Sequence, residues 1–174
     1  MVKYSTLLLF IFTFLTACQV QSQETASKCT SKAFEKKINN TLSFSVPTIV
    51  PSELAAMESP VILDAREKEE YNVSHIPGAR FIGYDDFDIS EVEDLNKDDL
   101  IVLYCSIGYR SEKIGEKLQK KGFTNVHNLY GSIFEWVNQG HEVVNDSGES
   151  TTKVHTYNKN WSKWLDDSKG ERVW

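Results

Sequence analysis

The sequence of 174 residues predicts an α/β fold with a mostly parallel sheet. Short apolar runs alternate with amphipathic segments from Thr30 onward, which is the pattern of strands alternating with helices. Residues 100–104 (LIVLY) form an unbroken apolar run, as is typical of a central strand in a parallel sheet. A hydrophobic fraction of 40% supports a buried core, and the length fits one domain without internal repeats.

The expected elements follow one another closely along the chain. Helical segments are predicted at residues 31–41, 51–57, 67–71, 111–121 and 131–138, and strands at 61–63, 80–82, 100–104 and 126–129. Pro51 suits the first turn of the second helix. We expect Ser111 to cap the fourth helix and Gly122 to end it.

The first 18 residues have the features of an export signal. Lys3 supplies a positive charge, and residues 7–17 form an apolar stretch too short to span a bilayer as a helix, which needs about 20 residues. The stretch ends in Leu-Thr-Ala-Cys at 15–18, which resembles the lipobox of bacterial lipoproteins; a plain secretory signal is the alternative. The resemblance implies a signal peptide at 1–17, lipidation of Cys18 and a protein lipid-anchored in the bacterial cell envelope. Residues 18–29 then form a flexible tether.

The net charge of −6 argues against a nucleic-acid partner, which needs a clustered basic surface. Residues 85–99 hold eight acidic residues and one lysine, so we expect a solvated acidic segment there that does not forbid an anionic substrate elsewhere. Three cysteines are too few for a disulfide scaffold. The four histidines lack metal-binding spacing, and we expect neither a metal nor another cofactor.

Cys105 stands directly after the central strand and before a helix. Parallel sheets bind ligands at the carboxyl ends of their strands, where backbone N–H groups and the start of a helix favour negative charge. A cysteine there is expected to have a lowered pKa and to be nucleophilic. Gly108 permits an unusual backbone angle, and Arg110 offers a cation for an anionic substrate. The alternative is a buried cysteine that only fills space.

Four segments together resemble the rhodanese (sulfurtransferase) family over about residues 46–144, a complete single domain. They are Asp64-Ala65-Arg66 with Glu70-Tyr71, Ser74-His75-Ile76-Pro77-Gly78-Ala79, Tyr104-Cys105 to Arg110-Ser111, and Leu129-Tyr130-Gly131 with Trp136. Ser74 and Ser132 stand where the family pattern has glycine. The resemblance implies a three-layer fold, with about five strands in a mostly parallel sheet and helices on both faces, over residues 30–144.

The resemblance also implies sulfur transfer from a small anionic donor such as thiosulfate to a thiol or cyanide. Cys105 is the expected nucleophile, which carries the sulfur as a persulfide. The implied substrate-binding residues are Ser106, Ile107, Gly108, Tyr109, Arg110, Ser111 and Arg66, with Asp64 in support. A persulfide carrier or partner-binding module is the alternative. A cysteine phosphatase or arsenate reductase is less favoured, because phosphatases place five residues between cysteine and arginine and this chain has four.

Several residues keep two interpretations. Asp64 and Arg66 either reach the active loop or pair structurally beneath it, and His75 is expected to be a hydrogen-bonded turn residue rather than a catalytic one. Cys29 is expected to be a free, partly buried thiol, with a disulfide to Cys105 as the alternative. Residues 145–174 are expected to form a linker and an aromatic C-terminal helix packed on or near the domain; a lid over the site or a docking segment is the alternative. We expect a monomer.

Overall fold

A computed structural model describes residues 27–174, and the predicted signal peptide, Cys18 and most of the tether lie outside these residues. The N-terminal half contains α1 (Lys32–Asn39), β1 (Thr48–Ile49), α2 (Pro51–Ala55), β2 (Val61–Asp64), α3 (Lys68–Val73), β3 (Arg80–Phe81) and the 3-10 helix η1 (Ile89–Val92). The C-terminal half contains β4 (Ile101–Tyr104), α4 (Tyr109–Lys120), β5 (Val126–Leu129), α5 (Ser132–Asn138), β6 (Val143–Val144), β7 (Ser150–Thr151), β8 (Lys153–His155), α6 (Lys159–Ser162) and β9 (Glu171–Val173).

The central sheet has five parallel strands in the order β1-β5-β4-β2-β3. This confirms the predicted α/β class, and β4 lies in the middle of the sheet, as its unbroken apolar sequence requires. The edge strand β1 was not predicted from the sequence. It has two residues, too few for any periodicity to be read.

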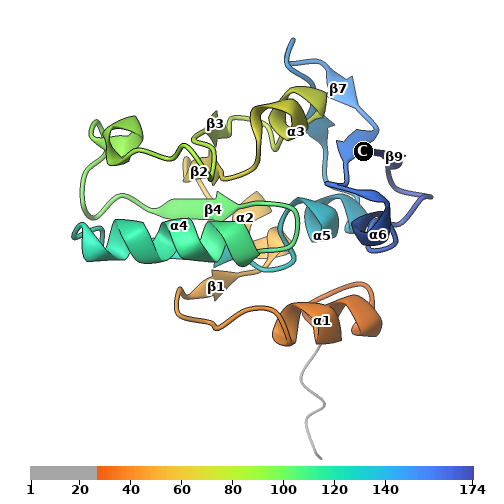
Figure 1. Ribbon diagram of the computed structural model, residues 1–174, viewed down its shortest axis with the longest axis horizontal. Helices are drawn as coiled ribbons and strands as arrows, with labels where there is room; N and C mark the ends of the chain where they lie inside the picture. The colour runs from red at the N-terminus through yellow and green to blue at the C-terminus, as the bar shows by residue number, and fades with distance from the viewer. Residues whose placement is uncertain (1–26) are drawn as a thin grey trace, which may run out of the picture.

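Alternate side chains of β4 enter the two layers that cover the sheet. Val102 and Tyr104 pack with residues of α1, α2 and α5, whereas Ile101 and Leu103 pack with residues of α4 and η1. Figure 1 shows α4 in front of the sheet and α2 and α5 behind it. The three-layer arrangement brings the carboxyl end of β4 and the start of α4 to the same edge of the sheet.

Helix α4 begins at Tyr109, and Gly108 is its N-cap, so the prediction that Ser111 caps this helix is wrong. The cause is the backbone of Gly108, whose φ of 117° turns the chain into the helix immediately after the cysteine loop. Ser111 is buried inside the first turn and donates a hydrogen bond of 2.7 Å to Oδ1 of Asn128 on β5.

Residues 145–174 were expected to form a linker and an aromatic C-terminal helix, but most of this segment is short strands and turns. Strand β7 pairs with β6, β8 pairs with β9, and α6 spans only four residues. A spacing of three residues between Trp161 and Trp164 requires only one helical turn, which is what α6 and the turn after it provide. The segment does pack on the domain, because Trp164 stacks on Phe34 of α1 at 5.6 Å between ring centroids and Leu165 is buried in the same core.

Within the described residues, no helix has both the length and the apolar character needed to cross a membrane.

Candidate active site

Cys105 follows the last residue of β4, and its side chain lies under the loop that leads into α4. Only 1% of the residue is exposed, and the N–H of Gly108 donates to its Sγ at 3.1 Å. Burial raises the pKa of the Cys105 thiol, but the charge of Arg110 and the N–H groups of Ser111 and Gly108 lower it by more, so the net shift is downward. The loop therefore stabilises a thiolate, and a persulfide anion on the same sulfur can use the same donors.

Gly108 is needed at this position for two reasons. Its φ of 117° lies in the left-handed region that other residues rarely adopt. A Cβ atom added there would also lie 3.3 Å from both methyl groups of Leu42, which follows α1. The loop that holds the Cys105 sulfur therefore depends on a residue without a side chain.

Arg110 is held by Glu70, which lies on α3. Nη1 and Nη2 of Arg110 donate to the two carboxylate oxygens of Glu70 at 2.6 Å and 2.9 Å, and Ser106 Oγ bridges the pair at 3.1 Å from Glu70 and 3.0 Å from Arg110. Burial raises the pKa of Glu70, but the hydrogen bonds and charge of Arg110 lower it by a larger amount. The net shift is downward, so Glu70 is ionised at neutral pH. Arg110 is thus a fixed but largely neutralised cation, and only 14% of its side chain is exposed.

Ser132 supports the backbone of Cys105. The N–H of Cys105 donates to Ser132 Oγ at 3.1 Å, and the hydroxyl donates to the carbonyl of Leu129 at 3.3 Å. Ser132 has a φ of 52°, which explains why the family pattern has glycine there. In this chain the hydroxyl satisfies a buried N–H that glycine could not satisfy.

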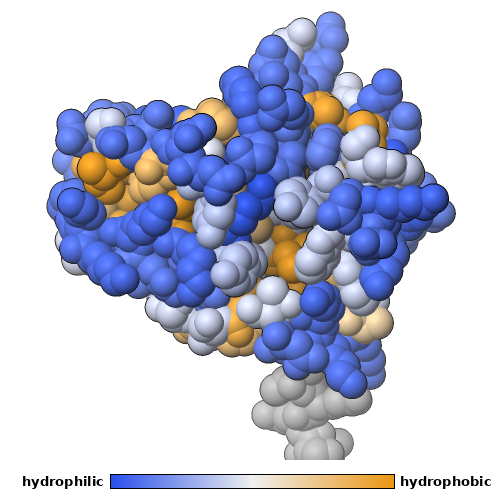
Figure 2. Space-filling model, viewed as in Figure 1, coloured by the Kyte–Doolittle hydropathy of each residue, from blue (hydrophilic) through white to orange (hydrophobic). Residues whose placement is uncertain are grey.

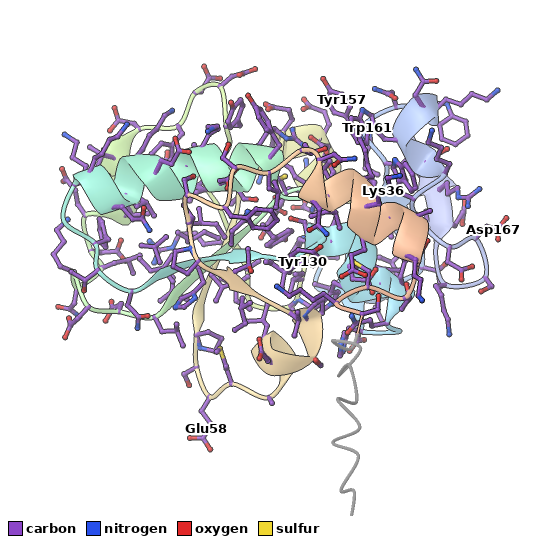
Figure 3. All side chains as sticks on the ribbon, turned by 90° about the horizontal axis from the view of Figure 1, so that it is seen from below. Lys36, Glu58, Tyr130, Tyr157, Trp161 and Asp167 are labelled. Atoms are coloured by element: carbon purple, nitrogen blue, oxygen red, sulfur yellow. The ribbon has the colours of Figure 1, made fainter. Side chains whose placement is uncertain are left out.

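A cleft of about 400 Å³ opens above the loop. It is lined by Thr41, Glu67, Tyr84, Asp85, Cys105, Ser106, Ile107, Tyr109, Arg110, Tyr157 and Trp161. Figure 2 shows a hollow with a hydrophobic floor between the start of α4 and the C-terminal segment. In Figure 3 the labelled Tyr157 and Trp161 lie together between α4 and α6. The cleft is therefore built by the loop on one side and by the C-terminal segment on the other.

The cleft brings together five of the residues predicted to bind or react with substrate: Cys105, Ser106, Ile107, Tyr109 and Arg110. Gly108 and Ser111 do not line the cleft and act from below, by shaping the loop and donating N–H groups to the sulfur. Asp85, from the segment that we expected to be merely solvated, lines the cleft as well.

Arg66 does not contact the cleft, so its predicted role in substrate binding is wrong. The side chains of Arg66 and Asp64 are fully buried, and they form an ion pair of 2.6 Å. Arg66 also donates to the carbonyl of Ser74 at 2.6 Å and packs over the ring of Tyr104. A buried guanidinium needs such partners, and together they direct it away from the cleft. The structural interpretation of this pair is therefore the correct one.

His75 and Cys29 lie outside the cleft. His75 Nδ1 is 3.1 Å from the carbonyl oxygen of Tyr71, and the two rings stack at 3.8 Å, as expected of a structural turn histidine. Cys29 is a buried free thiol. Burial and the charge of Glu135 raise its pKa, so it stays protonated at neutral pH. Among the described residues, no group of three or more acidic, histidine or cysteine side chains could hold a metal ion.

Reasoning from the sequence missed Glu70, Ser132, Tyr157 and Trp161 as parts of the site. Glu70 belongs to the first of the four segments that resemble the family, and Ser132 replaces a glycine of the last segment. The sequence of these segments does not show which residues the two side chains contact. The aromatic residues after position 156 predicted a segment that packs on the domain, with a lid over the site as one alternative. Tyr157 and Trp161 line the cleft, which agrees better with that alternative.

The family model of the rhodanese-like domain matches residues 50–139, and the chain belongs to this family. A protein of Bacillus subtilis strain 168 named as a candidate sulfur carrier, YrkF, is 38% identical over 79 residues, which cover 45% of this chain and 42% of the relative. A tRNA uridine(34) hydroxylase of Staphylococcus epidermidis is 43% identical over 81 residues, covering 44% of this chain and 25% of the relative. The chain thus spans less than half the length of these relatives.

Solved structures show the same fold. The crystal structure of the BH2092 protein from Bacillus halodurans has a TM-score of 0.54 and 24% sequence identity, and the match covers 67% of this chain and 86% of that one. The fold and the family place this protein among the rhodanese-like domains, and its sequence relatives include proteins named for sulfur carriage and for sulfur transfer.

Proposed function

We propose that this protein is a sulfurtransferase that moves sulfane sulfur through a persulfide on Cys105. The observation that carries the proposal is the loop itself, in which a thiol with a lowered pKa receives an N–H hydrogen bond and opens into a cleft. The thiolate attacks the outer sulfur of a donor such as thiosulfate, the S–S bond breaks with its electron pair leaving on sulfite, and Cys105 becomes a persulfide anion. A thiol or cyanide then takes the outer sulfur and returns the electron pair to Cys105.

The loop length favours sulfur over phosphate. Four residues separate Cys105 from Arg110, and the guanidinium is engaged by Glu70 rather than directed at the centre of the loop. A tetrahedral phosphate needs a wider ring of donors and a free arginine fork. A persulfide carrier that serves a partner protein is the second candidate, and the similarity to YrkF supports it.

Mass spectrometry of the intact protein after thiosulfate treatment tests the proposal. The wild type should gain one sulfur atom that cyanide removes, and Cys105→Ser should gain none. Cys29→Ser is the matched control and should gain sulfur like the wild type, because the pKa of Cys29 is raised by burial and its thiol stays protonated. Hydrolysis of phosphate esters without sulfur uptake contradicts the proposal. Turnover with free thiols separates an enzyme from a carrier, which needs its partner for release.

We further propose that the protein is exported and anchored by a lipid on Cys18, as the lipobox resemblance implies. Expression of the full chain in bacteria with a clickable fatty acid should label the wild type. Cys18→Ser should remain unlabelled and keep its signal peptide. Labelling of the Cys18→Ser variant to the same extent contradicts the anchor.

A further inference from the structure

A fully buried asparagine lies in the central sheet beside the active loop. Asn128 is in β5, with 0% of the residue exposed, and it lies opposite Leu103 of β4 and Thr48 of β1. Asparagine is disfavoured in strands, and burying its amide is costly unless the polar atoms are hydrogen-bonded. An apolar residue would suit this position better, so the retained amide points to a use for its hydrogen bonds.

Both polar atoms of the Asn128 side chain bond to the start of α4. Nδ2 donates to the carbonyl oxygen of Gly108 at 2.9 Å, and Oδ1 accepts from Ser111 Oγ at 2.7 Å. A carbonyl can only accept, so these partners define which end of the amide carries the nitrogen. Asn128 therefore ties the first turn of α4 to the strand beside β4, at the point where the chain leaves β4 through Cys105.

The bond to Gly108 acts on a residue that also holds the sulfur. The N–H of Gly108 donates to Cys105 Sγ at 3.1 Å, while its carbonyl is held by Asn128. Glycine has little steric preference of its own, so its φ of 117° is kept by the groups bonded to its two ends. The same carbonyl accepts from the N–H of Glu112, which starts the helix but does not attach the loop to the sheet.

The Ser111 hydroxyl has one proton and more than one acceptor. It lies 2.7 Å from Asn128 Oδ1 and 3.1 Å from the Gly108 carbonyl oxygen. The N–H groups of Ser111 and Gly108 lower the pKa of Cys105, and so does the Ser111 hydroxyl. While Asn128 accepts the hydroxyl proton, the two N–H groups remain for the sulfur. Without Asn128, the hydroxyl can turn toward the sulfur.

We propose that Asn128 is a positioning residue for the loop around Cys105. It holds the Gly108 carbonyl and the Ser111 hydroxyl, which keeps the N–H groups of these two residues directed at the sulfur. The inference rests on the proposed function of Cys105, because a persulfide anion on this sulfur uses the same donors as the thiolate. Asn128 itself does not line the cleft, so it acts through the loop and not on the substrate.

The test is the pH profile of Cys105 alkylation by iodoacetamide in the full chain, followed by mass spectrometry of the peptide that contains Cys105. The main comparison is Ser111→Ala against Ser111→Ala/Asn128→Ala, because without the hydroxyl these two proteins differ in the bond to Gly108. We expect the midpoint of the double variant to lie about 0.5–1 pH unit higher, and alkylation at neutral pH to be about three- to tenfold slower. Sulfur loading from thiosulfate should slow in parallel.

Two further variants assign this shift to the lost bonds. Asn128→Leu, which has a side chain of similar size, should shift the midpoint of the Ser111→Ala protein as Asn128→Ala does, which separates lost bonds from lost volume. In protein that keeps Ser111, Asn128→Ala should shift the midpoint by less, because the released hydroxyl turns to the sulfur. An equal or larger shift there contradicts the part assigned to the hydroxyl. Arg110 acts on the sulfur by its charge, and Arg110 and its partner Glu70 are kept throughout.

Asn138→Ala is the matched control. Asn138 is also buried and also bonds two backbone groups, the carbonyl of Trp164 at 3.0 Å and the N–H of Asp166 at 2.8 Å. These contacts hold the C-terminal segment and not the loop. This variant should therefore lose stability in urea as Asn128→Ala does, but it should keep the wild-type alkylation profile.

The outcomes separate this inference from the proposed function. Equal midpoints for Ser111→Ala and the double variant overturn the role of Asn128, and so does an equal shift in Asn138→Ala; sulfur transfer stands if the wild type still gains sulfur on Cys105. A wild type that gains none from any sulfane sulfur donor overturns the proposed function, whereas the alkylation profiles still decide the role of Asn128. A higher midpoint specific to the loss of Asn128, with slower sulfur loading, supports the inference.

Discussion

Replacing Glu70 with glutamine perturbs the buried ion pair behind the active loop while keeping the shape of the side chain. Glu70 accepts hydrogen bonds from Arg110 Nη1 and Nη2, from Ser106 Oγ and from the N–H of Glu67. Each of the two carboxylate oxygens accepts from two of these four donors. Whichever oxygen becomes an NH₂ group, two donors then face another donor, and the guanidinium of Arg110 loses its counter-charge.

The expected magnitude follows from this count. A hydrogen bond to a charged group contributes about 1.5–3 kcal/mol, and the Ser106 hydroxyl can rotate to accept from the new amide, which offsets part of the loss. The free energy of unfolding should therefore fall by about 3 kcal/mol, at the lower end of the 3–5 kcal/mol that breaking a buried ion pair costs. Arg110 is 14% exposed on its side chain, so solvent screens the remaining charge only weakly.

Urea unfolding followed by tryptophan fluorescence measures the change at neutral pH. Glu69→Gln is the matched control, because Glu69 is the exposed neighbour of Glu70 on α3, and its effect should stay within about 0.5 kcal/mol. In a double-mutant cycle, the double variant Glu70→Gln/Arg110→Gln should lose less free energy of unfolding than the sum of the losses of the two single variants. A loss for Glu70→Gln as small as that of the control refutes the assigned ion pair.

The pH dependence gives a second check on Glu70. Its pKa is lowered in the folded protein, because the hydrogen bonds and charge of Arg110 outweigh the opposing effect of burial. A carboxyl group with a lowered pKa contributes stability above its unfolded pKa of about 4.3, and this contribution is lost as the pH falls through the folded value. The stability difference between wild type and Glu70→Gln should therefore narrow in acid, and a gap that stays constant to low pH contradicts the ionised state.

Three further predictions concern the loop. Arg110→Gln should move the pH profile of Cys105 alkylation by iodoacetamide to higher pH, because burial then raises the thiol pKa without the opposing cation; an unchanged profile contradicts the role of Arg110. Gly108→Ala should lower the free energy of unfolding by about 1–3 kcal/mol, as measured in urea, because alanine is strained at a φ of 117° and its Cβ would lie 3.3 Å from the methyl groups of Leu42. Gly122→Ala is the comparison: it has a φ of 91° and open space around it, so it should cost only the backbone strain. Ser132→Ala should destabilise more than Ser132→Gly, since both leave the Cys105 N–H without its acceptor but only alanine keeps an unfavourable φ; equal losses of stability contradict the conformational part of this argument.

The local features of the site could be read from the sequence. The unbroken apolar run places β4 in the centre of the sheet, and a cysteine directly after such a strand must lie at its carboxyl end. Gly108 marked the turn that follows, and its positive φ confirms that prediction. These inferences succeed because hydrophobic periodicity and the conformational freedom of glycine act over a few residues.

The tertiary structure decided which charges and rings meet at the cleft. Glu70 neutralises Arg110 across 40 residues of sequence, and Arg66, which the same family segment contains, is directed into the core instead. Tyr157 and Trp161 reach the cleft only because the C-terminal segment folds back on α1 and α5. The sequence thus determined the position of Cys105 and of its loop at the end of the central strand. Packing between distant segments determined the charge and shape of the cleft above it, because such contacts depend on how whole elements fit together rather than on neighbouring residues.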